Sequence, residues 1–211
     1  MSGPSYCGVI LAAGASSRMG RDKALLPWPA ESETGTFLSG AMEAVGPATE
    51  RVIVVAGDNE PSLRGTVYAR AGYLVVNPEP AAGQFSSLRV GLRAVLDAGH
   101  DGAVVMLVDR PPVTTGTIRA LQEALAESVE EDVWACVPEY KGDHGHPLVM
   151  GREMIEALLR ADPNTTARDV LAANSEKIRY VPIDDANTVL NVNTPEEYAQ
   201  ASQNTTGESE L

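Results

Sequence analysis

One short segment, between residues 11 and 23, combines glycines, hydroxyls and positive charges directly after an apolar run. It reads Leu-Ala-Ala-Gly-Ala-Ser-Ser-Arg-Met-Gly-Arg-Asp-Lys. Its positive charges are on Arg18, Arg21 and Lys23. Glycines let backbone N–H groups approach an anion closely, and the guanidinium and ammonium groups add formal positive charge. The alternative is a polar connection that only turns the chain. The combination favours a phosphate-binding loop.

The spacing of the glycines in this loop excludes two common phosphate-binding motifs. A Walker A loop has four residues between its glycines and a lysine directly after the second. Here five residues separate Gly14 from Gly20, and Arg21 follows. The dinucleotide-binding pattern G-x-G-x-x-G is also absent, because Ser16 stands where its second glycine would be. The loop is therefore neither of the kinase type nor of the nicotinamide type.

A carboxylate, Asp109, directly follows the apolar run 103–108. Its side chain is expected at the C-terminal end of a strand, which is the edge where open α/β sheets bind ligands. Mg²⁺ prefers a few protein oxygens together with phosphates and water, so a carboxylate in this place suits it. The alternative is that Asp109 only caps a turn, but Thr114 or Thr115 is better placed to cap the following helix.

Further polar side chains stand at the ends of predicted elements. Asn77 ends an apolar run, while Ser86 and Ser87 lie where a helix begins, and free backbone donors there favour an anion or the polar edge of a base. Ordinary helix capping is the alternative for both serines. His144 and His146 would share one face of a strand, but neither cysteine lies nearby and the ligand spacing of a zinc site is absent.

Alternating strands and helices must position these residues. Most of the apolar runs lack the polar alternation of half-exposed strands, which indicates a largely parallel sheet covered on both faces. The segments between them repeat with the 3.6-residue period of helices. We therefore predict a three-layer α/β/α sandwich. The expected strands are 6–12, 51–56, 73–76, 103–108, 133–137, 146–150 and 178–183, and the expected helices are 36–45, 86–98, 115–126, 152–159, 166–173 and 195–201.

Length and charge limit the remaining possibilities. The chain has 211 residues, which suits one domain over 1–201, and its polar acidic end, 202–211, is expected to be a disordered tail. The net charge of −13 argues against binding to nucleic acid or to an anionic membrane, because both need excess Lys and Arg. Cys7 and Cys136 lie in apolar runs and are predicted to be buried and reduced. With neither a charged leader nor a long apolar segment, a cytoplasmic protein is expected.

The loop resembles the signature L-A-A-G-x-S-x-R-M-G-x-x-K of the nucleotidyltransferases that act on the molybdenum cofactor (MobA/MocA-like), and it matches every specified position. Five further motifs match in family order, so the resemblance covers most of the chain. They are Val76-Asn77-Pro78, Gly83-Gln-Phe-Ser86-Ser87-Leu88-Arg89, Asp109-Arg-Pro111, Gly145-His146-Pro147 and Asn193-Thr194-Pro195-Glu196.

This resemblance implies a Rossmann-like nucleotidyltransferase fold and a role for each matching residue. Asp109 would bind Mg²⁺ and, with Arg18 and Lys23, carry the catalytic charges. His146 would lie on the acceptor side. Asn191 ranks well below Asp109 as a metal ligand, since cytidylyltransferase-like members have an aspartate there and an amide adds no negative charge. The expected nucleotide contacts are Leu11, Ala12, Ala13, Gly14, Lys23, Asn77, Gln84, Ser86 and Ser87.

The resemblance also implies the reaction, transfer of CMP from CTP to the phosphate of a molybdopterin cofactor with release of pyrophosphate. In the family, Leu-Ala-Ala-Gly goes with cytidine and Leu-Ala-Gly-Gly with guanosine, so Ala13 favours CTP, whereas the ending at Asn191 is more like that of the guanylyltransferases. Three alternatives remain. The nucleotide could be GTP, or the acceptor could be a sugar phosphate or another phosphorylated alcohol. The protein could also be a non-catalytic nucleotide-binding or cofactor-chaperone protein. A molybdoenzyme is an expected protein partner.

Overall fold

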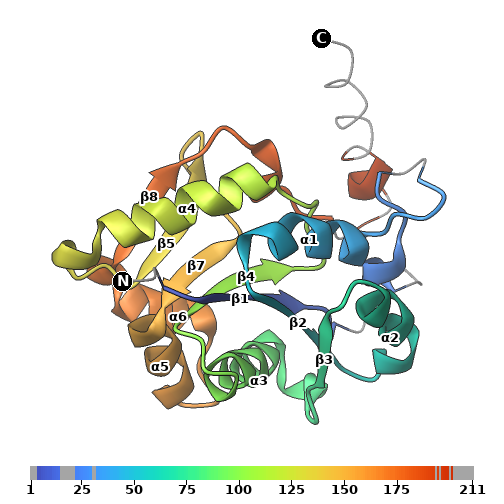
Figure 1. Ribbon diagram of the computed structural model, residues 1–211, viewed down its shortest axis with the longest axis horizontal. Helices are drawn as coiled ribbons and strands as arrows, with labels where there is room; N and C mark the ends of the chain where they lie inside the picture. The colour runs from blue at the N-terminus through green and yellow to red at the C-terminus, as the bar shows by residue number, and fades with distance from the viewer. Residues whose placement is uncertain are drawn as a thin grey trace.

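An eight-stranded sheet runs through the middle of the molecule, with helices on both of its faces (Figure 1). The computed structural model describes residues 4–14, 22–29, 32–192, 194, 196–199 and 201. The strands follow one another across the sheet in the order β3-β2-β1-β4-β7-β5-β6, and β8 pairs with β5 beside this path. Their bounds are β1 Tyr6–Leu11, β2 Arg51–Ala56, β3 Tyr73–Val76, β4 Gly102–Leu107, β5 Ala135–Tyr140, β6 Asp143–His144, β7 Leu148–Gly151 and β8 Ile178–Pro182.

The direction of the strands decides which ends meet. β1 is parallel to both of its neighbours, β2 and β4, and β3 is parallel to β2. β7 is antiparallel to both β4 and β5, so β4 and β5 run in the same direction. The residues that follow β1, β2, β3 and β4 therefore all emerge at one edge of the sheet. This is the edge where parallel α/β sheets bind their ligands.

Two sets of helices bury the two faces of the sheet. α1 (Phe37–Val45), α2 (Glu60–Ala69) and α4 (Thr115–Glu127) contribute to one hydrophobic cluster. α3 (Gln84–Asp97), α5 (Arg152–Arg160) and α6 (Ala167–Ala173) contribute to the other, on the opposite face (Figure 1). Successive side chains of β1 alternate between the two clusters, since Ile10 belongs to the first cluster and Val9 to the second. The predicted three-layer sandwich is confirmed.

The differences from the predicted elements have physical causes. α2 was not among the expected helices, because Pro61 and Gly65 interrupt its pattern and only Leu63 and Val67 are buried along it. α3 begins at Gln84, two residues before the predicted start. The predicted cap of α4 is confirmed at Thr114, whose side chain accepts a hydrogen bond from the backbone N–H of Thr117. The predicted tail, 202–211, lies outside the described residues.

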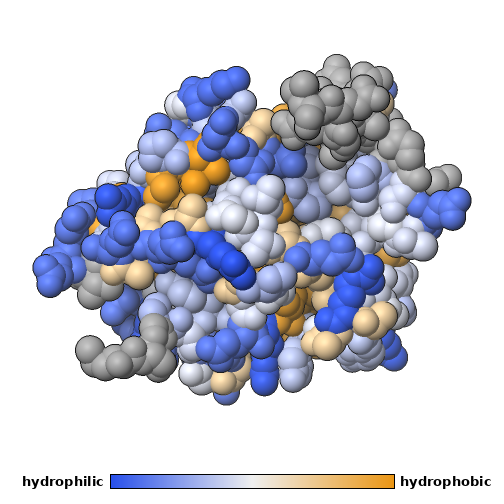
Figure 2. All heavy atoms as spheres, turned by 45° about the horizontal axis from the view of Figure 1, so that its top comes forward, coloured by the Kyte–Doolittle hydropathy of each residue, from blue (hydrophilic) through white to orange (hydrophobic). Residues whose placement is uncertain are grey.

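The two cysteines and the surface agree with the composition. Cys7 and Cys136 are buried and unpaired, as predicted, and burial raises the pKa of each thiol to about 11. Hydrophilic residues cover most of the face in Figure 2, and the hydrophobic ones form separate small areas. Within the described ranges, none of the helices combines the length and the apolar run needed to cross a membrane.

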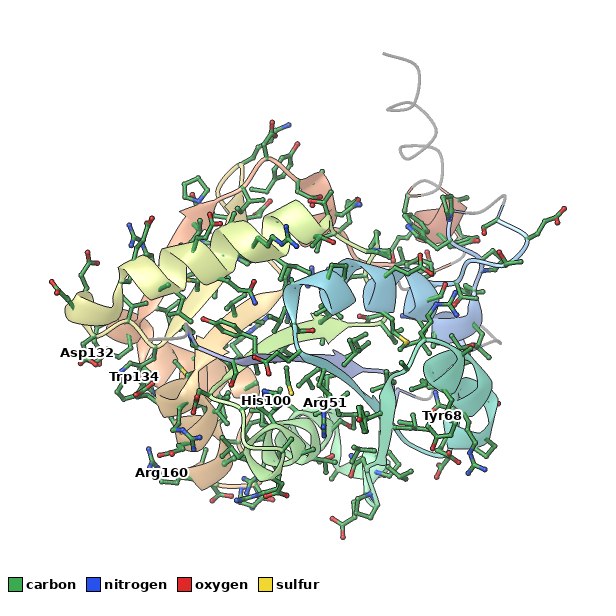
Figure 3. The ribbon with its side chains drawn as sticks, viewed as in Figure 1. Arg51, Tyr68, His100, Asp132, Trp134 and Arg160 are labelled. Carbon is green, nitrogen blue, oxygen red and sulfur yellow. The ribbon has the colours of Figure 1, made fainter. Side chains whose placement is uncertain are left out.

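A charged cluster at the beginning of β5 lies away from the ligand-binding edge. Asp132 accepts a hydrogen bond from the indole N–H of Trp134 (2.8 Å) and forms an ion pair with Lys177. Asp132 and Trp134 lie at the opposite end of the molecule from Tyr68 of α2 (Figure 3). β1 to β5 begin at the end of the sheet that carries this cluster, which is opposite the edge at which they end.

Candidate active site

The ammonium of Lys23 and the carboxylate of Asp109 lie together at the C-terminal edge of the sheet. Nζ of Lys23 is 4.0 Å from Oδ2 of Asp109, although the two residues belong to different loops. They meet because Lys23 follows the loop after β1, Asp109 follows β4, and these strands are parallel neighbours. The Lys23 side chain is 13% exposed and that of Asp109 is 36% exposed. The carboxylate thus remains accessible to a ligand.

A short helical turn fixes the backbone of Lys23. The 3₁₀ turn Lys23–Leu25 is capped by Asp22, whose Oδ1 accepts a hydrogen bond from the backbone N–H of Ala24 (3.0 Å). Oδ2 of Asp22 accepts a second hydrogen bond, from Nδ2 of Asn59 (2.7 Å). Sequence reasoning missed Asn59, because it lies in the loop of a neighbouring strand and belongs to none of the motifs.

The end of β1 offers its backbone more than its side chains. Leu11 and Ala12 are buried, Ala13 is half-buried and Gly14 is exposed. Ala13 and Gly14 are therefore the accessible residues here, while the side chains of Leu11 and Ala12 belong to the core, and contact of these four residues with a nucleotide remains a prediction. Arg18, the other predicted phosphate ligand of this loop, lies outside the described residues.

Asn77 joins the end of β3 to the first turn of α3. Its Nδ2 donates to the hydroxyls of Ser86 (2.8 Å) and Ser87 (2.9 Å), and its Oδ1 accepts from the backbone N–H of Glu79 (3.0 Å). Asn77 and Ser87 are buried, whereas Gln84 at the start of α3 is exposed. The predicted residues Asn77, Ser86 and Ser87 come together here, but the amide of Asn77 is hydrogen-bonded to protein groups. Contact of these four residues with a nucleotide remains a prediction.

His146 is a neutral, inward-facing histidine. Although part of the residue reaches the surface, Nδ1 of its ring is buried without a hydrogen-bond partner. Burial, and next the charge of Arg110, lower its pKa to about 3. The backbone of Val105 in β4 favours the protonated ring and so raises its pKa, but this is the smallest of the effects on it. An acceptor phosphate would therefore meet no positive charge on His146, and its place on the acceptor side remains a prediction.

Arg110 fastens the segment 188–192 to the end of β4. Its Nη1 donates to the carbonyl oxygens of Thr188 (3.1 Å) and Leu190 (3.5 Å), and the backbone N–H of Val192 donates to the Asp109 carbonyl (3.0 Å). Burial lowers the pKa of the guanidinium, while the neighbouring Asp109 carboxylate acts in the opposite direction. Asn191, which is exposed, precedes the residue whose backbone is bonded to Asp109. The sequence signal for Arg110 was a charged residue among prolines directly after a buried strand.

The donor set at this edge suits an ion that is shared with a substrate. In the part of the chain that the structure describes, no three His, Cys, Asp or Glu side chains come together as a metal cage. The accessible Asp109 carboxylate instead offers one hard oxygen site, and Asn191 adjoins Val192, whose backbone N–H donates to the Asp109 carbonyl. Mg²⁺ is commonly held in this way, through one or two carboxylates and the phosphates of its substrate.

Comparisons with known proteins point to one family. Residues 8–178 match the family model described as the MobA-like NTP transferase domain. A probable molybdenum cofactor guanylyltransferase from Mycobacterium ulcerans is 34% identical over 196 residues, which cover 90% of each chain. The molybdenum cofactor cytidylyltransferase of Escherichia coli is 26% identical over 196 residues and 92% of this chain, or 94% of its own.

A solved structure shares the fold. It is that of a Mycobacterium tuberculosis protein in complex with manganese, with a TM-score of 0.73, 24% sequence identity, and coverage of 94% of this chain and 98% of that one. At this identity the likeness concerns the arrangement of helices and strands.

Proposed function

Because the chain belongs to the MobA-like NTP transferase family, and is thereby a nucleotidyltransferase, we propose that it transfers CMP from CTP to the phosphate of a molybdopterin-type cofactor. The observation that carries the proposal is the pairing of Lys23 with the accessible Asp109 carboxylate at the ligand-binding edge. A molybdenum cofactor as acceptor is supported by the names of the two relatives from Mycobacterium ulcerans and Escherichia coli.

In the proposed reaction, an oxygen of the acceptor phosphate attacks the α-phosphorus of CTP. A new phosphorus–oxygen bond forms, the bond between the α-phosphorus and the bridging oxygen to the β-phosphate breaks, and pyrophosphate leaves with that electron pair. The attacking phosphate is already ionised at neutral pH, so the site needs no general base. The chain's main tasks are to hold two anions together and to offset their charge.

Lys23 and Asp109 carry out these tasks in our proposal. Lys23 contacts the phosphates of the nucleotide with its ammonium, which Asp109 keeps at the sheet edge. Asp109 holds a divalent ion, Mg²⁺ in our proposal, with Asn191 as a weaker second ligand. When bound, such an ion supplies positive charge that offsets the phosphates in the transition state. The manganese of the M. tuberculosis structure belongs to that protein.

The choice of CTP rests on the end of β1. Ala13 is half-buried there, and its methyl group would narrow a base pocket in which a glycine leaves room for a purine. GTP is the second candidate, favoured by the name of the 34% identical relative and by an amide at Asn191 where cytidylyltransferase-like members have a carboxylate. Isothermal titration of CTP and GTP, each with Mg²⁺, distinguishes them. Tighter binding of GTP would exclude our choice.

Pyrophosphate release tests the proposed site. Purified protein is incubated with molybdopterin, Mg²⁺ and CTP, and the same assay is run on Asp109→Asn and Asp101→Asn. The two aspartates stand at opposite ends of β4, and Asp101 is bound by Arg152 away from the site (2.9 Å). Turnover should be lost in Asp109→Asn and retained in Asp101→Asn. If Asp109→Asn retained the same turnover as Asp101→Asn, Asp109 would have no part in the reaction.

A further inference from the structure

Asn59 lies in the turn between β2 and α2 and faces the loop that leaves β1. It occupies the residue before α2, the usual capping position, yet its side chain makes no capping bond to its own helix. The side chain is half-buried and turned toward the neighbouring strand. Its amide therefore serves something other than α2.

The amide of Asn59 joins both flanks of the segment 15–21. Its Nδ2 donates to the carbonyl oxygen of Ala12 (2.8 Å) and to Oδ2 of Asp22 (2.7 Å), and its Oδ1 accepts from the backbone N–H of Gly57 (3.1 Å). Both amide hydrogens are thus used. The end of β1 approaches the turn after β2 closely at Gly57, because a Cβ there would lie 3.1 Å from the carbonyl oxygen of Ala13.

A continuous path of contacts leads from Asn59 to the ammonium of Lys23. Asn59 holds one oxygen of Asp22, whose other oxygen caps the turn in which Lys23 is the first residue. From this turn, Nζ of Lys23 comes to 4.0 Å from Asp109. A lysine ammonium sits on a flexible four-carbon stem, so its place depends on how firmly the backbone below it is held.

We propose that Asn59 is a positioning residue that fixes Lys23 for the nucleotide phosphates by tying Asp22 to the end of β1. The inference rests on the proposed function, in which Lys23 contacts those phosphates. Since its amide is occupied by three protein partners, Asn59 acts through Asp22 rather than on the substrate. A displacement of Lys23 by about an ångström is enough to impair transfer severely.

An exchange of donor and acceptor tests this inference. In Asn59→Asp, two carboxylates face each other, and the affinity for CTP or GTP with Mg²⁺, measured by isothermal titration, should fall at least about tenfold. In the double variant Asp22→Asn with Asn59→Asp, the new amide donates to the new carboxylate, while the bond to the Ala12 carbonyl stays lost, so part of the affinity should return. Wild-type affinity in Asn59→Asp, or a double variant that binds no better than Asn59→Asp, would overturn the proposal.

Two further variants separate positioning from stability and from the proposed function. Asn59→Ala is compared with Asn174→Ala, which loses a side-chain bond to a backbone carbonyl (2.8 Å) at the end of α6. If the two alanine variants show similar thermal shifts and only Asn59→Ala binds nucleotide more weakly, the positioning role is supported. If both alanine variants bind nucleotide equally well, the positioning role is overturned, even if Asn59→Asp does not fold. If Lys23→Ala binds nucleotide normally, the proposed phosphate site fails as well. If Lys23→Ala binds weakly and Asn59→Ala normally, the positioning role alone fails.

Discussion

Acidification should destabilise this protein through His146, whose ring nitrogen Nδ1 is buried. Its ring is neutral in the folded chain, where burial and the charge of Arg110 lower its pKa from 6.5 to about 3. In the unfolded chain the ring regains its ordinary pKa. Below pH 6.5 the unfolded state therefore binds a proton that the folded state does not. The stability is present in full above that pH and is lost progressively as the pH falls toward 3.

The size of the effect follows from the proton that only the unfolded chain binds. Between the two pKa values, each pH unit removes about 1.4 kcal/mol from the free energy of unfolding. From about pH 7.5 to about pH 4.5 the loss from His146 alone is about 2–3 kcal/mol. This value hardly changes if the pKa in the folded chain is one unit higher, because the lower end of the range still lies above it.

Denaturant unfolding of the wild type and of His146→Gln over this pH range measures the effect. Glutamine is also polar and cannot take up the proton, so the variant should lose about 2–3 kcal/mol less on acidification. His144→Gln is the control for the chemical change, because His144 lies on the surface, and the wild-type loss should persist in it. Parallel curves for the wild type and His146→Gln would refute the reasoning.

Three substitutions test other contacts at this edge. Asp109→Asn should reduce turnover at least about a hundredfold in a pyrophosphate-release assay, while circular dichroism stays unchanged because the side chain is partly exposed. Arg110→Met removes a buried donor to Thr188 and should cost about 1–3 kcal/mol in chemical unfolding, against less than about 1 kcal/mol for the exposed Arg119→Met. Gly145→Ala would place a Cβ 1.9 Å from the Thr188 carbonyl oxygen and should lower the thermal midpoint by several degrees; an unchanged midpoint would show that this segment is not held there.

Much of the fold could be predicted because local signals and tertiary structure agree. The strands at 51–56 and 73–76 were predicted with the bounds that β2 and β3 have, since their apolar runs end at charged or turn-forming residues. α2 was missed because a proline and a glycine hide its period and only two of its residues are buried. β5 starts two residues late and continues to Tyr140, where pairing with β6 and β8, rather than hydrophobicity, extends it.

The candidate site divides in the same way. Lys23 and Asp109 could be predicted to meet, because both follow buried strands whose ends share an edge. The role of Asn59 could not be predicted, and Arg110 stood out only as a charged residue beside prolines, because the contacts of both depend on which carbonyl groups neighbouring loops present to them. The sequence predicts Asn77 as a nucleotide contact, and only the positions of Ser86 and Ser87 show that its amide nitrogen donates within the protein.

Transfer of the α-phosphate tests the central claim most directly. The protein is incubated with Mg²⁺, molybdopterin, and CTP or GTP labelled at the α-phosphate, and the products are separated. The account predicts that label from CTP appears covalently attached to the molybdopterin phosphate, with one pyrophosphate released for each nucleotide joined, and that Asp109→Asn and Lys23→Ala abolish or strongly slow the transfer. Label transferred from GTP alone, or no transfer to molybdopterin from either nucleotide, would contradict it.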